Sequence, residues 1–188
     1  MAISCGADAV GFVFWPRSPR FIDPYRARAI ARALPAFVTT VGVFVNQPAA
    51  YVNGVAGLVR LGAVQLHGDE TPQDARGLVS PVLKALSGAA AERDADAWND
   101  PVTLLFDAHD RERRGGTGQP ADWDVARRIA QRRRLMLAGG LKAENVSEAV
   151  SVVRPFGVDV SSGVEQEPGV KDHGRLRAFF EALQSVTR

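Results

Sequence analysis

The stretch from residue 135 to residue 165 constrains the fold more than any other part of the chain. Two short apolar runs, Leu135–Ala138 and Gly157–Val160, lie on either side of a segment with helical periodicity. Apolar residues of that segment recur at i, i+3, i+4 and i+7, and so share one face of a helix: Val146, Ala149, Val150 and Val153. A strand, a helix and a second fully apolar strand predict a βαβ unit, whose parallel strands are buried on both faces.

Both predicted strands of this unit end in turns made of small residues. Gly139 and Gly140 follow the first strand, and Ser161, Ser162 and Gly163 follow the second. Turns of this kind expose backbone N–H groups next to the start of a helix, which is the geometry that binds a phosphate group. Because the two turns follow consecutive strands, they predict one phosphate site, in the position that a TIM barrel uses after its last two strands.

The alternation of strand and helix runs through the whole chain. Apolar runs predict seven strands, centred near residues 10, 41, 64, 84, 104, 137 and 158. A closed (β/α)₈ barrel has eight strands and at least about 200 residues, whereas this chain has 188. Since the chain ends on a helix that follows a strand, the missing strand should be the first one. We therefore predict an α/β TIM barrel, a single domain over residues 1–188, that is truncated at its N-terminus and lacks its first strand.

Charge and cysteine content exclude several classes of protein. The formal net charge is only +2, which does not indicate a nucleic-acid partner. No apolar run approaches the roughly 20 residues of a membrane span, and the N-terminus lacks the basic region of a signal peptide. The single cysteine, Cys5, rules out an internal disulfide and suits a reducing compartment. These features predict a cytoplasmic enzyme or binding protein with no membrane partner.

Three polar residues near strand ends are candidates for chemistry. Asp107 follows the apolar run Val102–Phe106, at a position from which TIM-barrel enzymes take catalytic residues. A carboxyl group there can act as a general acid, but its position alone leaves a helix-cap or loop aspartate equally open. Arg20 is either a clamp for a carboxylate or phosphate or an exposed loop arginine. His67 is expected to support neighbouring side chains. The polar loop after Asp107 contains the segment 115–118, Gly-Gly-Thr-Gly, which can close over a substrate.

Ordered motifs across nearly the whole chain resemble the phosphoribosylanthranilate isomerase family of tryptophan biosynthesis. They run from Gly6 to about Asp172 and continue into the last helix. In order they are GADAVGFVF with SPR, VGVFVN, AVQLHGDE, Asp107 with GGTG and DW, LAGGL with ENV, and VDVSSGVE with PGVKD.

The resemblance implies an Amadori rearrangement of N-(5-phosphoribosyl)anthranilate to 1-(2-carboxyphenylamino)-1-deoxyribulose 5-phosphate, without a metal or other cofactor. It implies that Asp107 is the general acid that protonates the furanose ring oxygen. Arg20 would help to hold the anthranilate end of this phosphosugar substrate, and Asp159 would lie near the substrate on the last strand. The resemblance also places the phosphate at Gly139-Gly140 and at Ser161-Ser162-Gly163.

One departure from the family concerns its general base. In the family this base is a cysteine in a Lys-Ile-Cys-Gly segment on the first strand, and this sequence contains no such segment. Cys5 does not replace it, because Cys5 aligns just before Gly-Ala-Asp, a whole helix later. The loss of one half of an acid–base pair typically lowers the rate by ~10²–10⁴-fold. We therefore expect that Met1 is not the natural start and that the chain in this form is inactive.

Other readings remain open beside the isomerase. A ribulose-phosphate epimerase needs several His and Asp ligands at strand ends, and the three histidines of this sequence do not supply them. An indole-glycerol-phosphate synthase needs a strand-end lysine, but Lys84 lies inside its predicted strand and Lys142 at the start of a helix. A non-catalytic phosphosugar-binding barrel, or an inert fragment, is favoured by the missing strand and disfavoured by Asp107. The sequence gives neither the oligomeric state nor any fusion to a pathway partner.

Overall fold

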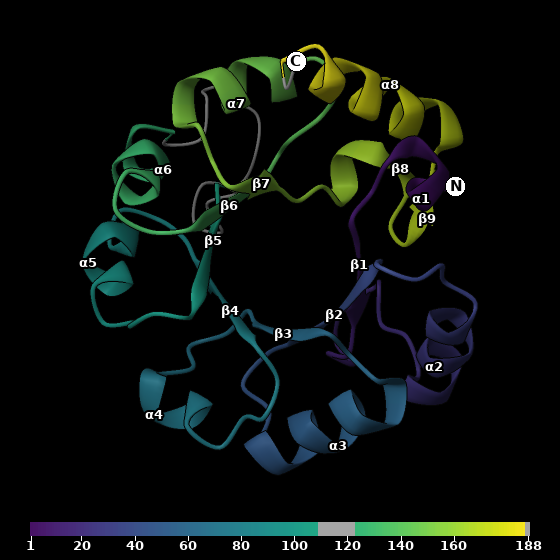
Figure 1. Cartoon of the computed structure of the whole chain (residues 1–188), viewed down its shortest axis with the longest axis vertical. Helices are drawn as coiled ribbons and strands as arrows, with labels where there is room; N and C mark the ends of the chain where they lie inside the picture. The colour runs from purple at the N-terminus through teal and green to yellow at the C-terminus, as the bar shows by residue number, and fades with distance from the viewer. Residues whose placement is uncertain (109–122, 187–188) are drawn as a thin grey trace. The chain divides into compact units, whose positions relative to one another are not determined.

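The computed structural model describes residues 1–108 and 123–186, which form two compact units, 1–84 and 85–188. Each unit consists of parallel strands with helices packed along them (Figure 1). The Gly-Gly-Thr-Gly segment, and Asp122 as the predicted cap of the following helix, lie outside the described residues. The two units are therefore described one after the other.

The first unit contains four strands that pair in parallel in the order of the sequence. In register, Val41 pairs with Ala63, and Leu66 pairs with Lys84. Helices α2 and α3 lie side by side along the strands (Figure 1). The elements are α1 (Ala2–Cys5), β1 (Ala9–Val13), α2 (Pro24–Arg32), β2 (Thr39–Phe44), α3 (Ala49–Val59), β3 (Ala63–Leu66), α4 (Pro72–Ala75) and β4 (Val82–Leu86), which ends just past the boundary of the unit.

The core of the first unit forms between these strands and helices. The spacing of Val52, Val55, Ala56 and Val59 in the sequence predicts one apolar face of a helix, and all four are buried in α3. The stacked rings of Phe14 and Phe44 lie 5.3 Å apart and join the ends of β1 and β2. Asp23 followed by Pro24 predicts a helix cap, and the Asp23 carboxylate accepts hydrogen bonds from the Tyr25 and Arg26 N–H groups at the start of α2.

In the sequence, the spacing of Ala27, Ile30, Ala31 and Leu34 predicts the buried face of the next helix, and this prediction is wrong at its C-terminal end. Ala27 is fully buried, but Ile30 is 47% exposed. The helix ends at Arg32 and has only about two and a half turns, so Leu34 lies beyond it. The buried face is therefore narrow and centred on Ala27.

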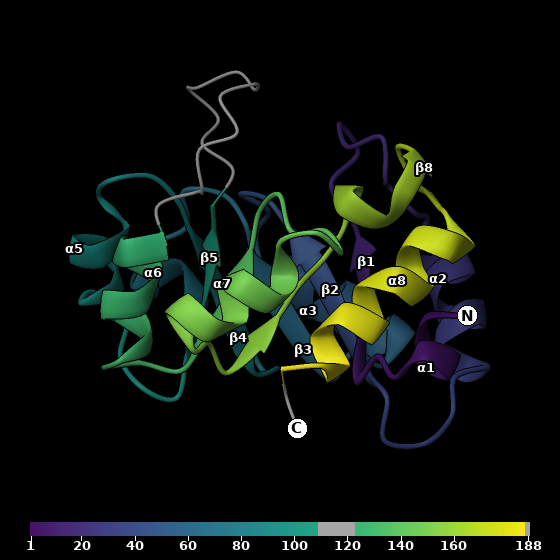
Figure 2. The same ribbon diagram turned by 90° about the horizontal axis from the view of Figure 1, so that it is seen from above.

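The second unit contains three parallel strands, an antiparallel hairpin and four α-helices within its described residues. The helices α6 and α7 lie side by side (Figures 1 and 2). The elements are α5 (Ala91–Ala95), β5 (Thr103–Asp107), α6 (Trp123–Ala130), β6 (Leu135–Ala138), α7 (Val146–Val153), β7 (Gly157–Val158), the 3₁₀ turn η1 (Ser162–Val164), β8 (Glu165–Glu167), β9 (Val170–Lys171) and α8 (His173–Gln184).

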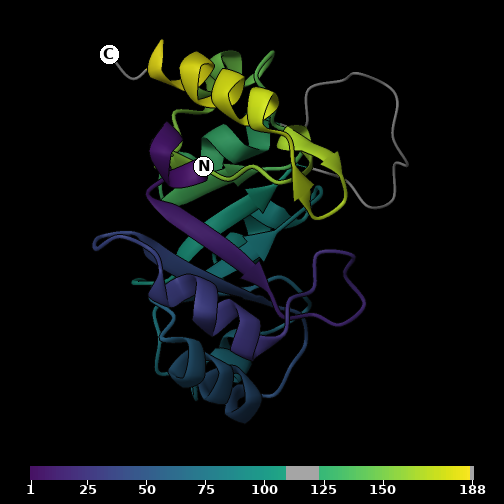
Figure 3. The same ribbon diagram turned by 90° about the vertical axis from the view of Figure 1, so that its right-hand side faces the viewer.

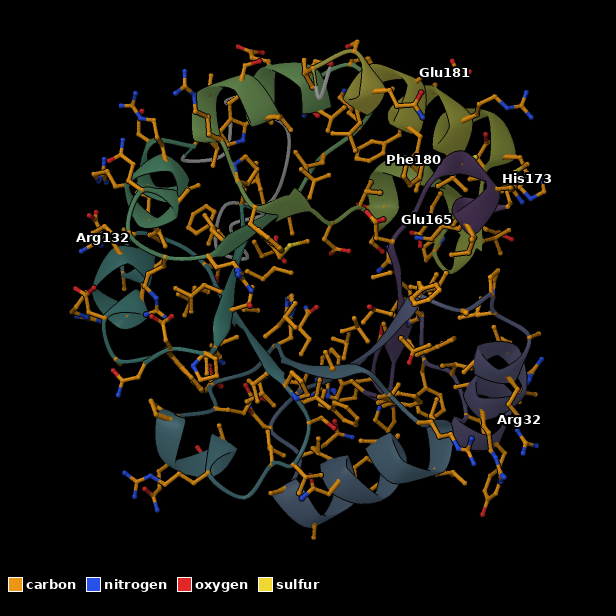
Figure 4. All side chains as sticks on the ribbon, viewed as in Figure 1. Arg32, Arg132, Glu165, His173, Phe180 and Glu181 are labelled. Atoms are coloured by element: carbon orange, nitrogen blue, oxygen red, sulfur yellow. The ribbon has the colours of Figure 1, made fainter. Side chains whose placement is uncertain are left out.

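Helices α7 and α8 bury most of the residues that the sequence predicts. In α7, Val146, Ala149 and Val153 are buried and Val150 is half-buried. The predicted stripe of α8 is buried at two positions, Leu176 and Phe179, and half-buried at its other two, Phe180 and Leu183. Figure 4 shows Phe180 on the inner side of α8 and Glu181 on the outer side.

Seven parallel strands therefore lie where the sequence predicts them, with differences only at their ends. One such difference is at β7, which ends at Val158 rather than Val160. The Asp159 N–H group still donates to the Leu137 carbonyl over 2.8 Å, and pairing then stops because β6 turns away at Gly139. Among the described residues, no helix is long and apolar enough to cross a membrane.

Candidate active site

The three strands of the second unit bring several predicted site residues to one edge. Asp107 is the last residue of β5 and pairs in register with Ala138, the last residue of β6. Leu137 in turn pairs with Val158, the last residue of β7. Because parallel strands in register end at the same edge of a sheet, the half-buried Asp107 and the two turns after β6 and β7 lie at that edge.

The turn after β6 requires its two glycines. Gly139 and Gly140 have φ angles of +85° and +66°, which residues with a side chain rarely adopt. The side chain of Asn145 holds this turn from the start of α7: its Oδ1 accepts a hydrogen bond from the Lys142 N–H group over 2.9 Å. Its Nδ2 atom donates to the Gly140 carbonyl over 3.1 Å. The glycine turn is therefore fixed to the helix that follows it.

The turn after β7 packs directly against the turn after β6. A Cβ atom placed on Gly163 would lie 1.8 Å from the Leu141 carbonyl oxygen, so only glycine permits this approach. Ser161 and Gly163 are half-buried and Ser162 is exposed. The two predicted phosphate turns thus form one continuous surface of backbone in the second unit.

Asp159 lies one residue beyond β7 and is exposed. It is therefore at the same strand edge as Asp107. The sequence predicts Asp159 inside the last strand, but the strand ends one residue before it. Both aspartates belong to the part of the second unit that carries the two glycine-containing turns.

A hairpin after these turns carries an ion pair with a buried carboxylate, which is not among the residues predicted from the sequence. Glu165, at the start of β8, has a side chain only 4% exposed, and its carboxylate lies 2.9 Å from Lys171 Nζ in β9. Lys171 Nζ also donates to the Ser161 carbonyl over 3.0 Å. Figure 3 shows the hairpin next to the first turn of α8, and Figure 4 labels Glu165 on it.

Arg20 belongs to the first unit and lies in the loop that follows β1. It is half-buried, and its backbone N–H group donates to Ser18 Oγ over 3.1 Å. The end of this loop returns to β1, where the Ile22 N–H group donates to the Val13 carbonyl over 3.0 Å. The loop is thus closed on itself at the carboxyl end of its strand.

The ends of β2, β3 and β4 in the first unit are joined by a second ion pair. Lys84 Nζ lies 2.8 Å from Glu70 Oε2, and both side chains are 5% exposed. Lys84 also donates to the Gly68 carbonyl over 2.6 Å. The Glu70 carboxylate accepts the N–H groups of Asn46 over 2.7 Å and of Gly68 over 2.9 Å. One ion pair therefore holds the loops after β2 and β3 to the strand β4.

Two opposing effects set the pKa of Glu70. Burial raises the pKa. The hydrogen bonds from Lys84 and from the Asn46 N–H group, together with the charge of Lys84, lower it by more than burial raises it. The net pKa of Glu70 lies below the ordinary value of a glutamate, so Glu70 is a carboxylate at neutral pH. His67 lies beside this network, with its Nδ1 atom 2.7 Å from the buried Gln65 amide.

The lysine of this ion pair gives a signal that the sequence analysis does not use. Lys84 is the one charged residue in the run Val-Leu-Lys-Ala-Leu, which is predicted as a buried strand. A buried ammonium group needs a carboxylate partner, and Glu70 follows the preceding strand. This signal finds Lys84 and Glu70 but not the second pair, because Lys171 is 40% exposed and lies in a polar segment.

These features define the class of protein: a TIM-barrel-like α/β enzyme, with polar side chains and glycine turns gathered after its parallel strands. A sequence model described as "N-(5'phosphoribosyl)anthranilate (PRA) isomerase" matches residues 1–182. The chain belongs to the N-(5'-phosphoribosyl)anthranilate isomerase family, a family of enzymes of tryptophan biosynthesis.

Individual relatives agree with this assignment. The isomerase of Pelobacter propionicus is 45% identical over 99% of this chain and 90% of its own length. The crystal structure of the Thermotoga maritima enzyme is 43% identical, has a TM-score of 0.90, and is matched over 98% of this chain and 91% of its own. A structure of the isomerase in complex with reduced 1-(o-carboxyphenylamino)-1-deoxyribulose 5-phosphate is 41% identical, with a TM-score of 0.86 and the same coverage.

These comparisons bear on two expectations from the sequence. The resemblance to the isomerase family is confirmed. The expected loss of activity through truncation is not supported, since the relatives cover at least 98% of this chain.

Proposed function

We propose that this chain catalyses the Amadori rearrangement of N-(5-phosphoribosyl)anthranilate to 1-(2-carboxyphenylamino)-1-deoxyribulose 5-phosphate, with Asp107 as general acid. The observation that carries the proposal is the register of β5, β6 and β7. This register sets the half-buried Asp107 at the same strand edge as the turns at Gly139-Gly140 and Ser161–Gly163. An acid next to a phosphate cradle suits a substrate with a sugar ring and a phosphate.

In this reaction the Asp107 carboxylic acid gives its proton to the furanose ring oxygen. The bond between that oxygen and C1 breaks, and the nitrogen lone pair of the anthranilate forms a C1=N double bond. Loss of the proton from C2 then gives an enolamine, which becomes the ketone of the product. An acid held at this oxygen typically contributes ~10²–10⁴-fold to the rate.

We assign the removal of the C2 proton to no residue of this chain. The family resemblance implies a cysteine in a Lys-Ile-Cys-Gly segment, which the sequence does not contain. Cys5 is half-buried in the short helix α1, before β1, and is not proposed as the base.

We assign the other parts of the substrate to the binding residues that the sequence predicts. We propose that the backbone of Gly139, Gly140 and the segment Ser161-Ser162-Gly163 binds the phosphate, because these turns expose N–H groups. Arg20 binds the anthranilate carboxylate as a planar two-pronged donor. Asp159 lies near the sugar, at the same strand edge as Asp107. The phosphosugar bound in the related complex supports this substrate class.

The proposal extends to the whole fold and its setting. A single barrel domain of the TIM type is proposed from the family resemblance, and so is a reaction without a metal or cofactor. The cytoplasmic location, inferred from the single cysteine, stays a prediction.

Isomerase turnover tests the proposal directly, through the loss of anthranilate-type fluorescence and the identification of the product by mass. The chain is compared with Asp107→Asn, which keeps the size of the side chain but cannot donate the proton. Cys5→Ser is the control, because Cys5 lies outside the proposed site. Turnover that is lost in Asp107→Asn and retained in Cys5→Ser supports the proposal. No turnover in the unmodified chain overturns it and favours a non-catalytic phosphosugar-binding protein.

A further inference from the structure

We propose that Lys171 is a positioning residue of the phosphate site, which fixes the turn at Ser161 so that its backbone can bind the substrate phosphate. This inference deepens the proposed function, because it takes the turn after β7 as a phosphate site. The family resemblance implies no role for Lys171.

Lys171 holds the turn through a short set of contacts from β9. Its Nζ atom donates to the Ser161 carbonyl over 3.0 Å and lies 2.9 Å from the Glu165 carboxylate. A third, longer contact of 3.5 Å reaches Ser161 Oγ. Two of these contacts are short, so two of the three N–H donors of the ammonium group are held by the Ser161 carbonyl and the Glu165 carboxylate. Through these two contacts Lys171 acts on the turn.

The contact with the Ser161 carbonyl sets the direction of the next N–H group. In a trans peptide the C=O and N–H bonds point to opposite sides. Because Lys171 draws the Ser161 carbonyl to its own side, the Ser162 N–H group points away from Lys171. Among the described residues, the Ser162 and Gly163 N–H groups donate to no backbone carbonyl outside η1, so both can face an anion.

The turn is also held from its other side. Gly163 packs against the Leu141 carbonyl at a distance that no side chain permits. The turn is thus clamped between the glycine loop after β6 and the ammonium group of Lys171. A clamped turn presents its N–H groups without reorganisation when the phosphate arrives, and this preorganisation favours binding.

Glu165 keeps Lys171 in place. Its side chain is 4% exposed and accepts a further hydrogen bond from the Gly169 N–H group over 3.3 Å. The backbone carbonyl of Glu165 accepts a 2.5 Å hydrogen bond from Arg175 Nη1 at the start of α8. A buried carboxylate of this kind needs a cation, and Lys171 supplies it within the same hairpin.

The expected effect of Lys171→Met is on substrate binding rather than on chemistry. We expect KM and the inhibition constant of inorganic phosphate to rise together by about tenfold, as for the loss of one charge-assisted hydrogen bond. The value of kcat should change less than threefold, since Asp107 is on a different strand. Lys171→Arg keeps a cationic donor and should restore most of the phosphate affinity. A purely structural role would lower the amount of folded enzyme, and would not separate KM from kcat.

Arg177→Met is the matched control. Arg177 is an exposed cation of α8, and its removal changes the net charge by the same amount. We expect its KM to stay within twofold of that of the unmodified chain. If Lys171→Met does not fold, Lys171→Met/Glu165→Gln removes the buried charge as well and carries the same expectation.

Calorimetric titration with inorganic phosphate separates this inference from the proposed isomerase activity. If the unmodified chain has no turnover but binds phosphate, and Lys171→Met weakens that binding about tenfold, the isomerase proposal fails and the inference about Lys171 stands. If folded Lys171→Met binds phosphate as tightly as the unmodified chain, the inference is overturned. It is overturned equally if kcat falls while KM and phosphate affinity stay unchanged.

Discussion

Replacing Lys84 with methionine tests how the first unit holds its strand ends together. The substitution removes the ammonium group that contacts the Glu70 carboxylate at 2.8 Å and the Gly68 carbonyl at 2.6 Å. Glu70 is 5% exposed, so water cannot replace the lost cation, and backbone N–H groups such as those of Asn46 and Gly68 compensate only part of its charge. Breaking a buried pair from one side typically costs about 3–5 kcal/mol. For a chain of this length, that shifts the melting temperature by roughly 10 °C.

Urea unfolding at pH 7 measures this cost, with Arg93→Met as the control. Arg93 and Asp94 form an ion pair at 3.0 Å, but the two side chains are 82% and 46% exposed. Its loss should change the free energy of unfolding by at most about 1 kcal/mol.

The double variant Lys84→Met/Glu70→Gln removes the unpaired charge, so it should recover at least half of the loss. The reasoning is refuted if Lys84→Met costs no more than Arg93→Met, or if the double variant is as unstable as the single one.

Three further outcomes follow from the same structure. The pKa of Glu70 is lower in the folded chain than in the unfolded one. Its contribution to stability is therefore present above the unfolded pKa of about 4.3 and is lost as the pH falls through the folded pKa. Between pH 6 and pH 3, the free energy of unfolding in urea should fall more steeply for the unmodified chain than for Glu70→Gln. Gly163→Ala sets a Cβ atom against the Leu141 carbonyl and should weaken phosphate binding at least tenfold, as measured by calorimetry. As its control, Gly57→Ala adds a Cβ atom in open space on α3 and should raise the free energy of unfolding by about 0.5–1 kcal/mol. Asp23→Ala removes the acceptor of the Tyr25 and Arg26 N–H groups at the start of α2 and should cost about 0.5–2 kcal/mol in urea unfolding, a result that an unchanged midpoint would contradict.

The strands and the two glycine turns are predictable from the sequence because local patterns determine them. A strand buried on both faces is a short apolar run, and three such runs give the bounds of β3, β4 and β6 as the structure has them. The positive φ angles of Gly139 and Gly140 are likewise a local property. The order of strands then places Asp107 beside the glycine turn without any knowledge of side-chain contacts.

The rest of the candidate site is not predictable in this way. Ile30 lies inside α2 and has the spacing of a buried residue but is exposed, because burial depends on which face of the helix its neighbours cover. The end of β7 depends on where its partner strand β6 ends, because Leu137 is the last residue of β6 that pairs with β7. That partner is distant in the sequence. The partners of Lys84 and Lys171 also depend on tertiary contacts, since a lysine in the sequence does not show which carboxylate it meets.

The two ion pairs solve the same physical problem in the two units. The carbonyl groups of a loop outside regular secondary structure need hydrogen-bond donors from elsewhere. Lys84 does this for Gly68 and Lys171 does it for Ser161, and each lysine comes from a later strand and is neutralised by a buried glutamate. A lysine suits this role because one ammonium group can bind a carbonyl and a carboxylate at once. At the buried Lys84, arginine would need room for a planar group of five donors, whereas the half-exposed side chain of Lys171 leaves that room. The charge of both lysines therefore serves the backbone of the loops. We expect the loss of Lys84 to lower stability and the loss of Lys171 to weaken phosphate binding.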